Sequence, residues 1–162
     1  MSYGQELSVL GCELGSSFEK TYKTLETRFG EERVYKVSST EIALIDHVLG
    51  NTEWNLIRFV FQSEVANNTR RTYLSHIQLS NNFSESDLAF SCFKEWNEKL
   101  EKKYKYYSFE EQEKNGDTEF VVWYNNGEIY IHYVYAKAQN GNYYWHVFIN
   151  YAKDFVDESN DY

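Results

Sequence analysis

Two stretches of this chain resemble each other, and that internal similarity limits the possible folds more than any other feature. Segment 18–29 aligns without a gap on segment 93–104, so that position 18 corresponds to position 93 at an offset of 75 residues. Two later pairs of segments match in the same order, at offsets of 74 and 70: 56–61 with 130–135, and 73–77 with 143–147. Three ordered matches predict a single domain over 1–162, built of two copies of one unit, 11–80 and 81–152.

The first copy is predicted to begin with a short amphipathic helix. Ser16 offers an N-cap oxygen, Glu19 completes a capping box three residues later, and Gly30 ends the helix. The apolar residues recur at spacings of four, three and four, which places them on one helical face: Phe18, Tyr22, Leu25 and Phe29.

The second copy is predicted to begin with a longer helix. Ser84 can serve as its N-cap, and Phe83 before it can pack against Leu88 as a hydrophobic staple. The apolar stripe of this helix predicts its buried side: Leu88, Cys92, Phe93, Trp96, Leu100 and Tyr104.

Short segments rich in β-branched and aromatic residues predict strands, one before the first helix and the others after each helix. They lie at 7–10, 34–37, 42–48, 54–62, 72–79, 106–109, 118–124, 128–136 and 142–151. The polar segments 64–71 and 110–117 are interpreted as hairpin loops, the Asn-Asn-Gly at 125–127 as a tight turn, and 153–162 as a frayed tail. The predicted class is α+β: a helix followed by three or four antiparallel strands, twice, with the helices packed on one face of the sheet.

Side-chain alternation along the strands divides the predicted sheet into two faces. The more apolar face is expected to be the core beneath the helices: Ile57, Phe59, Phe61, Ile77, Leu79, Phe120, Val122, Ile129, Ile131, Tyr133, Trp145, Val147 and Ile149. The opposite face is the candidate partner-binding site: Trp54, Arg58, His76, Trp123, Tyr130, His132, Tyr144, His146 and Phe148. Exposed aromatic rings can supply the energetic centre of a protein interface or stack on sugar rings. A protein partner, a small molecule or carbohydrate, and a purely structural or dimerising role are the alternatives for this face.

The composition narrows the classes of partner. The formal net charge of −9 disfavours nucleic acid and anionic lipid surfaces, and it suits either a basic protein partner or simple solubility. Aromatic residues make up 19% of the chain, which is enough to build a substantial core. No apolar run reaches the roughly 20 residues that span a bilayer, and the first residues lack the basic and apolar segments of a signal peptide.

No pattern in the chain indicates catalysis, a cofactor or a metal. None of the histidines has a companion at ligand spacing, and Cys92 lies in the middle of a predicted helix on its apolar stripe. The two cysteines, Cys12 and Cys92, do not form a disulfide framework, although a single bridge between them stays open. We therefore expect a non-enzymatic binding protein without a cofactor, and a homodimer stays open.

Three motifs carry a resemblance to a known group of proteins. They are Gly11-x-x-x-Gly15-Ser16-Ser17-x-Glu19, Leu25-x-x-Arg28-Phe29-Gly30, and Trp54-Asn55-x-Ile57-x-Phe59-x-Phe61-Gln62. The chain resembles small uncharacterised exported bacterial proteins whose tandem helix-plus-sheet repeats are similar to the beta-lactamase-inhibitor-protein-like fold. The resemblance implies export to the periplasm or the medium, with the signal peptide absent from this sequence, while a cytoplasmic location stays open. In that inhibitor family a concave, aromatic-rich sheet face grips a partner protein, but no functional residue of the family maps onto this chain by motif.

Overall fold

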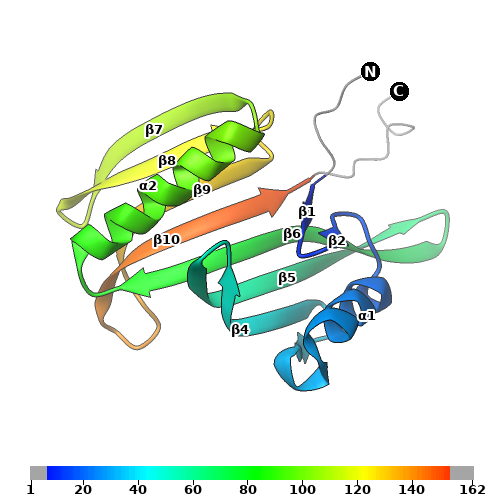
Figure 1. The fold of residues 1–162 in the computed structure, drawn as a ribbon. Coiled ribbons are helices and arrows are strands. Elements are labelled where there is room, and N and C mark those ends of the chain that lie inside the picture. The colour runs from blue at the N-terminus through cyan, green and yellow to red at the C-terminus, as the bar shows by residue number, and fades with distance from the viewer. Residues whose placement is uncertain (1–6, 154–162) are drawn as a thin grey trace. The chain divides into compact units, whose positions relative to one another are not determined.

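An eight-stranded antiparallel sheet and two α-helices dominate the computed structural model, which describes residues 7–153 (Figure 1). The strand order is β3-β4-β5-β6-β10-β9-β8-β7, and a separate two-stranded sheet pairs β1 with β2. The helices are α1 (Phe18–Phe29) and α2 (Ser86–Lys103), with a 3₁₀ turn at Glu31–Arg33. The strands are β1 (Ser8–Val9), β2 (Cys12–Glu13), β3 (Tyr35–Ser38), β4 (Glu41–Leu49), β5 (Thr52–Ala66), β6 (Thr69–Phe83), β7 (Tyr106–Lys114), β8 (Asp117–Tyr124), β9 (Ile129–Lys137) and β10 (Tyr143–Ala152). The predicted α+β class with an antiparallel sheet is confirmed, and the predicted tail lies almost wholly outside the described residues.

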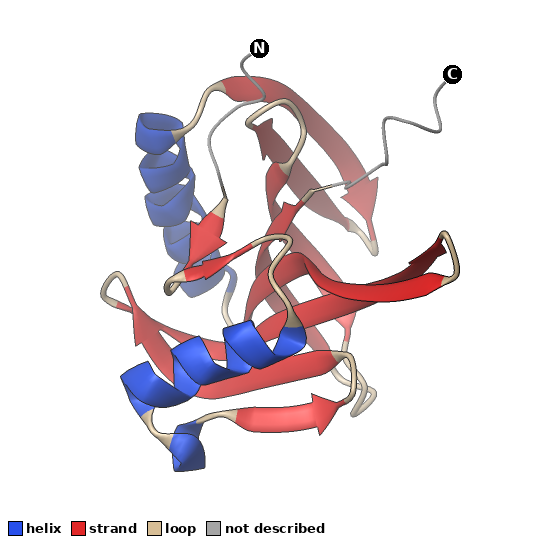
Figure 2. Cartoon of the chain, turned by 90° about the vertical axis from the view of Figure 1, so that its right-hand side faces the viewer, coloured by secondary structure: helices blue, strands red, loops and turns tan. Residues whose placement is uncertain are grey.

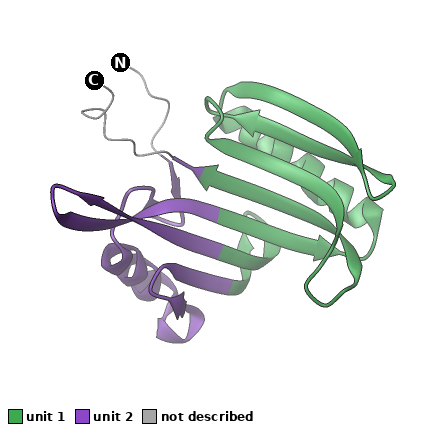
Figure 3. Cartoon of the chain, turned by 180° about the vertical axis from the view of Figure 1, so that it is seen from behind, with its two compact units in different colours: residues 1–5, 45–57, 78–151 green, residues 6–44, 58–77, 152–162 purple. Residues whose placement is uncertain are grey.

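The chain divides into two compact units (Figure 3). Within the described residues, unit 1 comprises 45–57 and 78–151, and unit 2 comprises 7–44, 58–77 and 152–153. Unit 1 therefore holds α2, β7 to β9 and all of β10 except its last residue, Ala152, and unit 2 holds α1 and β1 to β3. Strands β4, β5 and β6 contribute longer stretches to both units.

Helix α1 begins one residue later than the sequence predicts. Ser17, and not Ser16, is the N-cap, and its hydroxyl accepts a hydrogen bond from the Lys20 backbone N–H at 3.1 Å. The backbone carbonyl of Ser16 instead accepts from the Leu74 N–H in β6 at 2.8 Å. Because Ser16 is tied to a strand, the capping role passes to the next serine.

Helix α2 also begins later than predicted, at Ser86. Its N-cap is Glu85, which makes no side-chain capping bond, so the prediction of a Ser84 cap is wrong. Leu88 is 55% exposed, so its predicted place on the buried stripe is wrong. The reason is that β6 continues to Phe83 and takes up the residues expected to open the helix. The remaining stripe of Cys92, Phe93, Trp96 and Leu100 is buried as predicted.

The turn between β4 and β5 contacts the C-terminal half of α2 within unit 1. Gly50 has a φ of +59°, and a Cβ at this position would lie only 3.1 Å from the Trp96 ring. The Lys99 ammonium donates to the Gly50 carbonyl at 2.6 Å, and the Trp96 indole N–H donates to the Thr52 hydroxyl at 2.7 Å. The close approach and the two hydrogen bonds together hold the helix against this turn.

Two hairpins are longer than the sequence indicates. The predicted loop at 64–71 shrinks to Asn67-Asn68, and the predicted loop at 110–117 shrinks to Asn115-Gly116. The backbone φ angles at these turns are all positive, as two-residue hairpin turns require. Polar side chains in the hairpin arms lie in water on both sides, which hides the alternation that would reveal a strand.

The predicted core is largely confirmed. Eleven of its thirteen residues are buried, whereas Phe120 and Trp145 are only half-buried. In unit 1, α2 lies along one side of strands β8 and β9 (Figures 1 and 2). The core lies between them, where Phe93 of α2 contacts both Phe120 and Tyr133.

Candidate functional site

Six of the nine predicted site residues lie together on one face of unit 1. We call this group the aromatic sheet face: Trp123, Tyr130, His132, Tyr144, His146 and Phe148. Strand register brings them together, because Trp123 pairs with Tyr130 across β8 and β9, and Phe148 pairs with His132 across β10 and β9. Helix α2 packs on the opposite face of the same strands, since its Phe93 contacts Tyr133, the neighbour of His132 in the alternation.

Ring contacts connect the six side chains without a break. Trp123 lies 4.8 Å from Tyr130 between ring centroids, and Tyr130 lies 6.4 Å from His132. His132 lies 5.9 Å from Phe148, which stacks on His146 at 5.5 Å and an interplanar angle of 7°. Tyr144 meets His146 edge-on at 6.4 Å. The rings thus shield one another, and all but the buried His146 are half-buried.

Trp54 lies elsewhere, and its predicted place on the exposed face is wrong. Its side chain is fully buried, with its ring 5.2 Å from that of Trp96 in α2. Burial along β5 changes phase here, because Trp54 and Ile57 are both buried although they are three positions apart. Strict alternation would have put these two side chains on opposite faces.

The side chain of Asn81 in β6 accompanies this change of phase. Its amide oxygen accepts from the Asn55 backbone N–H at 2.6 Å, and its amide nitrogen donates to the Glu53 carbonyl at 3.0 Å. In return, the Asn55 side chain accepts from the Asn82 backbone N–H at 2.9 Å. Side-chain amides thus occupy backbone groups next to Trp54, and the local pairing departs from a regular ladder.

The other two predicted site residues, Arg58 and His76, belong to unit 2. The Arg58 guanidinium forms an ion pair with Glu41 at 2.6 Å, and a His76 ring nitrogen lies 3.1 Å from the Ser75 hydroxyl. Burial, with Arg58 nearby, lowers the pKa of His76. Both side chains therefore have structural partners within their own unit.

A buried carboxylate lies at the rim of the aromatic sheet face. Glu119 in β8 is 5% exposed, and its carboxylate lies 3.0 Å from the His132 Nε2. Its other oxygen accepts a hydrogen bond from the Gln112 amide of β7. Burial works to raise the pKa of Glu119, but Gln112 and His132 outweigh it, and the net result is a lowered pKa. The face therefore has a negative charge held in place by two neighbours.

His146 is the most buried of the six side chains of the aromatic sheet face. Its Nε2 lies 3.1 Å from the Ala136 carbonyl, to which it donates in the neutral tautomer with a protonated Nε2. Burial lowers the pKa of His146, and the nearby His132 lowers it further. The hydrogen bond to the Ala136 carbonyl works in the opposite direction but does not cancel this shift. A neutral His146 stacked on Phe148 thus acts as an aromatic ring at neutral pH.

Metal binding, reactive cysteines and membrane-spanning helices are the next features to consider in the described residues. In the range 7–153, no three His, Cys, Asp or Glu side chains gather closely enough to hold a metal ion. Cys12 and Cys92 are free and buried, and burial raises the pKa of the Cys92 thiol to about 11. Such a thiol is almost fully protonated at neutral pH and is a poor nucleophile. None of the helices in this range has the length and apolarity needed to cross a membrane.

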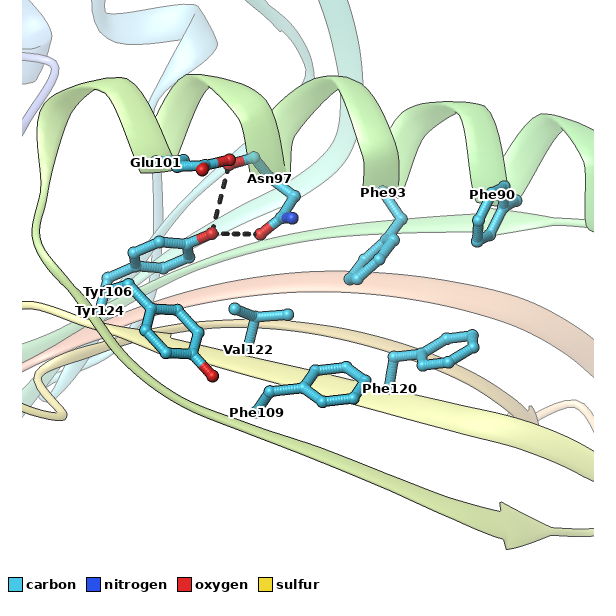
Figure 4. A pocket seen from close by; sticks show the side chains of 9 residues that line it. All are labelled: Phe90, Phe93, Asn97, Glu101, Tyr106, Phe109, Phe120, Val122 and Tyr124. Carbon is cyan, nitrogen blue, oxygen red and sulfur yellow. Dashed lines mark hydrogen bonds between the residues drawn. The ribbon is translucent and has the colours of Figure 1, made fainter.

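A pocket of about 440 Å³ lies on the helix side of unit 1, and sequence reasoning missed it (Figure 4). It lies between α2 and strands β7 and β8 and is lined by Phe90, Phe93, Asn97, Glu101, Tyr106, Phe109, Phe120, Val122 and Tyr124. A signal was present, because Phe90 is an aromatic residue three positions before Phe93 and Phe109 is the last residue of a predicted strand.

Comparisons with known proteins add no relative. No family of proteins matches this chain, and neither the curated proteins nor the solved structures provide a match. No function therefore carries over to this chain from a relative.

Proposed function

We propose that this protein is a non-enzymatic binding protein that engages a partner protein through the aromatic sheet face. The observation that supports this most directly is the unbroken chain of ring contacts from Trp123 to Tyr144. Rigid, half-buried aromatic rings lose little conformational entropy on binding, and they are enriched at the energetic centres of protein interfaces.

The order of elements supports the finer proposal of two copies. Helix α1 is followed by β3 to β6, and α2 is followed by β7 to β10. The strand order β3-β4-β5-β6-β10-β9-β8-β7 reads as two similar four-strand groups in opposite directions. This is the arrangement expected if a duplicated helix-plus-sheet unit forms the fold, as the resemblance to inhibitor-type proteins implies.

Charge favours a basic partner over other proteins. The chain has a formal net charge of −9, and the buried Glu119 adds a fixed negative group beside His132. Complementary charge accelerates association and makes affinity depend on ionic strength. We therefore expect binding that weakens as salt is added. Export of the protein belongs to the same proposal and rests on the sequence resemblance alone.

The proposal requires that the Trp123 ring is reached from solvent, and acrylamide quenching of tryptophan fluorescence tests this. We expect the quenchable fraction of the emission to fall in Trp123→Phe and to stay unchanged in Trp54→Phe, because Trp54 is fully buried. Equal quenching losses in the two variants would contradict the accessible face.

Partner recognition is then tested by affinity capture from the native secretome, followed by calorimetry with the purified protein that is captured. We expect Trp123→Ala to weaken that complex at least tenfold, while Leu88→Ala on the exposed side of α2 leaves it unchanged. A complex that both variants retain equally would refute the proposal. Self-association seen by light scattering and lost in Trp123→Ala would favour the dimerising role, and capture by immobilised sugars would favour carbohydrate recognition.

A further inference from the structure

The pocket beside α2 lies on the face of unit 1 opposite to the aromatic sheet face. Three phenyl rings lie in nearly parallel pairs there: Phe93 with Phe120 at 6.0 Å and 25°, and Phe109 with Phe120 at 6.1 Å and 23°. Figure 4 shows Phe93 descending from the helix while Phe109 and Phe120 rise from the strands. This arrangement presents ring faces and edges on two sides of one space, which suits another planar ring.

Three aromatic side chains that line the pocket remain exposed to solvent. Phe90 is 45% exposed, Phe109 is 47% exposed and Tyr106 is 55% exposed. Grouped apolar side chains that remain in water are a common mark of a ligand site. The volume of about 440 Å³ has room for roughly 15 non-hydrogen atoms at the density of a liquid, about 30 Å³ for each.

The polar end of the pocket is chemically distinct from its apolar wall. Asn97 and Glu101 lie four residues apart on α2 and so share one side of the helix. The Tyr124 hydroxyl has one proton, which it shares between the Asn97 amide oxygen at 2.5 Å and the Asn97 backbone carbonyl at 3.4 Å (Figure 4). Burial, with the Glu101 carboxylate as the next cause, raises the pKa of Tyr124 to about 12. The carboxylate is thus close enough to Tyr124 to influence its ionisation.

The charge that lines this end of the pocket is negative. Glu101 is the one charged side chain among the nine residues that line the pocket. Beside it, the rings of Tyr106 and Tyr124 meet edge to face at 6.3 Å and 81°. A carboxylate and electron-rich ring faces both attract a cation, and both repel an anion.

We infer that this pocket binds a small aromatic molecule that carries a protonated amine. The aromatic part packs among Phe93, Phe109 and Phe120, and the ammonium group faces Glu101 and the amide oxygen of Asn97. The inference does not depend on the proposed partner protein, because the two sites use opposite faces of the strands.

Three probes of matched size test the inference by NMR titration of the full chain. They are 4-phenylbenzylamine, the neutral 4-phenylbenzyl alcohol and the anionic biphenyl-4-carboxylate. We expect the amine to bind most tightly, the alcohol more weakly and the carboxylate least. The shifted resonances should belong to the residues that line the pocket.

Substitutions of residues that line the pocket distinguish the contribution of the Glu101 charge to binding from that of the apolar wall. We expect Glu101→Gln to weaken the amine about three- to fivefold and to change the alcohol less than twofold, as is usual for a solvent-accessible ion pair. Glu98→Gln, an exposed neighbour on the same helix, is the matched control and should change neither probe. Phe109→Ala should weaken both probes, because it removes part of the apolar wall.

Several results would overturn the inference. They are equal affinity for all three probes, tightest binding of the carboxylate, shifts that map outside the pocket, or no saturation below 1 mM amine. Loss of amine binding in Glu98→Gln to the same degree as in Glu101→Gln would also overturn it, since a general acidic field would then explain the preference.

Discussion

Strands β8, β9 and β10 carry aromatic side chains on both faces, and the two faces remove these rings from water in different ways. On the helix side, Tyr133 and Phe120 contact Phe93 of α2, and Tyr133 is 6% exposed. On the aromatic sheet face, rings such as Phe148 contact other rings and stay half-buried. Ring packing between strands therefore buries aromatic side chains less completely than a covering helix does. The titratable side chains His132 and His146 also lie among the rings of the aromatic sheet face.

The largest expected difference between the two faces is the loss of unfolding free energy when one phenyl ring is removed from each. Phe93→Ala is expected to cost about 3–5 kcal/mol of unfolding free energy, because it opens a cavity beneath α2. Phe148→Ala on the aromatic sheet face is expected to cost about 1–2 kcal/mol, because water already reaches its ring. Urea denaturation of both variants measures the difference, and equal losses would show that the aromatic sheet face is as well packed as the core.

A second, smaller effect concerns the change of phase in β5 that places Trp54 on the helix side. Asn81→Ala leaves the Asn55 N–H and the Glu53 carbonyl without their side-chain partner, at an expected cost of about 1–3 kcal/mol. Asn82→Ala is the matched control, since its side chain is exposed and only its backbone bonds to Asn55. Denaturation midpoints together with the tryptophan emission wavelength report both stability and the position of Trp54. An unchanged midpoint in Asn81→Ala would show that the strand keeps its phase without the amide.

The smallest effect expected is a pH dependence that distinguishes the two faces. The pKa of His146 is lowered, so the unfolded chain takes up a proton at a higher pH than the folded chain. Its contribution to stability is complete above the unfolded pKa of about 6.5 and is lost as the pH falls below that value. Glu119, whose pKa is also lowered, adds a further loss in more acidic solution. We expect His146→Phe to flatten the decline in urea midpoint between pH 7.5 and 5.5, whereas Phe93→Ala should shift the midpoint equally at both pH values.

His76 supplies a share of the same pH dependence from unit 2, since its pKa is lowered as well. The slope in His146→Phe should therefore decrease without vanishing. A slope identical to that of the unchanged protein would contradict a buried neutral His146.

The sequence predicts the parts of this fold that depend on periodicity. Alternation along β9 and β10 placed Ile131, Val147 and Ile149 in the core, and the same alternation brought His132 and Phe148 together on the opposite face. These assignments succeed because the strands are regular and one of their faces is strongly apolar.

Features that depend on a single distant hydrogen bond could not be read from the sequence. The position of Trp54 accompanies contacts of Asn81, which is 26 residues away from Asn55 along the chain. The choice of Ser17 over Ser16 as N-cap accompanies a backbone bond from Leu74 to Ser16. The pocket beside α2 escaped for a related reason, because its lining comes from a helix and two strands whose relative position follows from packing.

The outer strand β7 has a consequence for the behaviour of concentrated solutions. It ends the sheet and carries Glu110, Glu111 and Glu113 against a single Lys114, so acidic side chains are in excess at one edge of the described sheet. Two such edges aligned at the usual strand spacing of about 4.8 Å would bring like charges face to face. Electrostatic repulsion therefore protects this edge from uncontrolled growth into aggregates at neutral pH, and added salt weakens that protection.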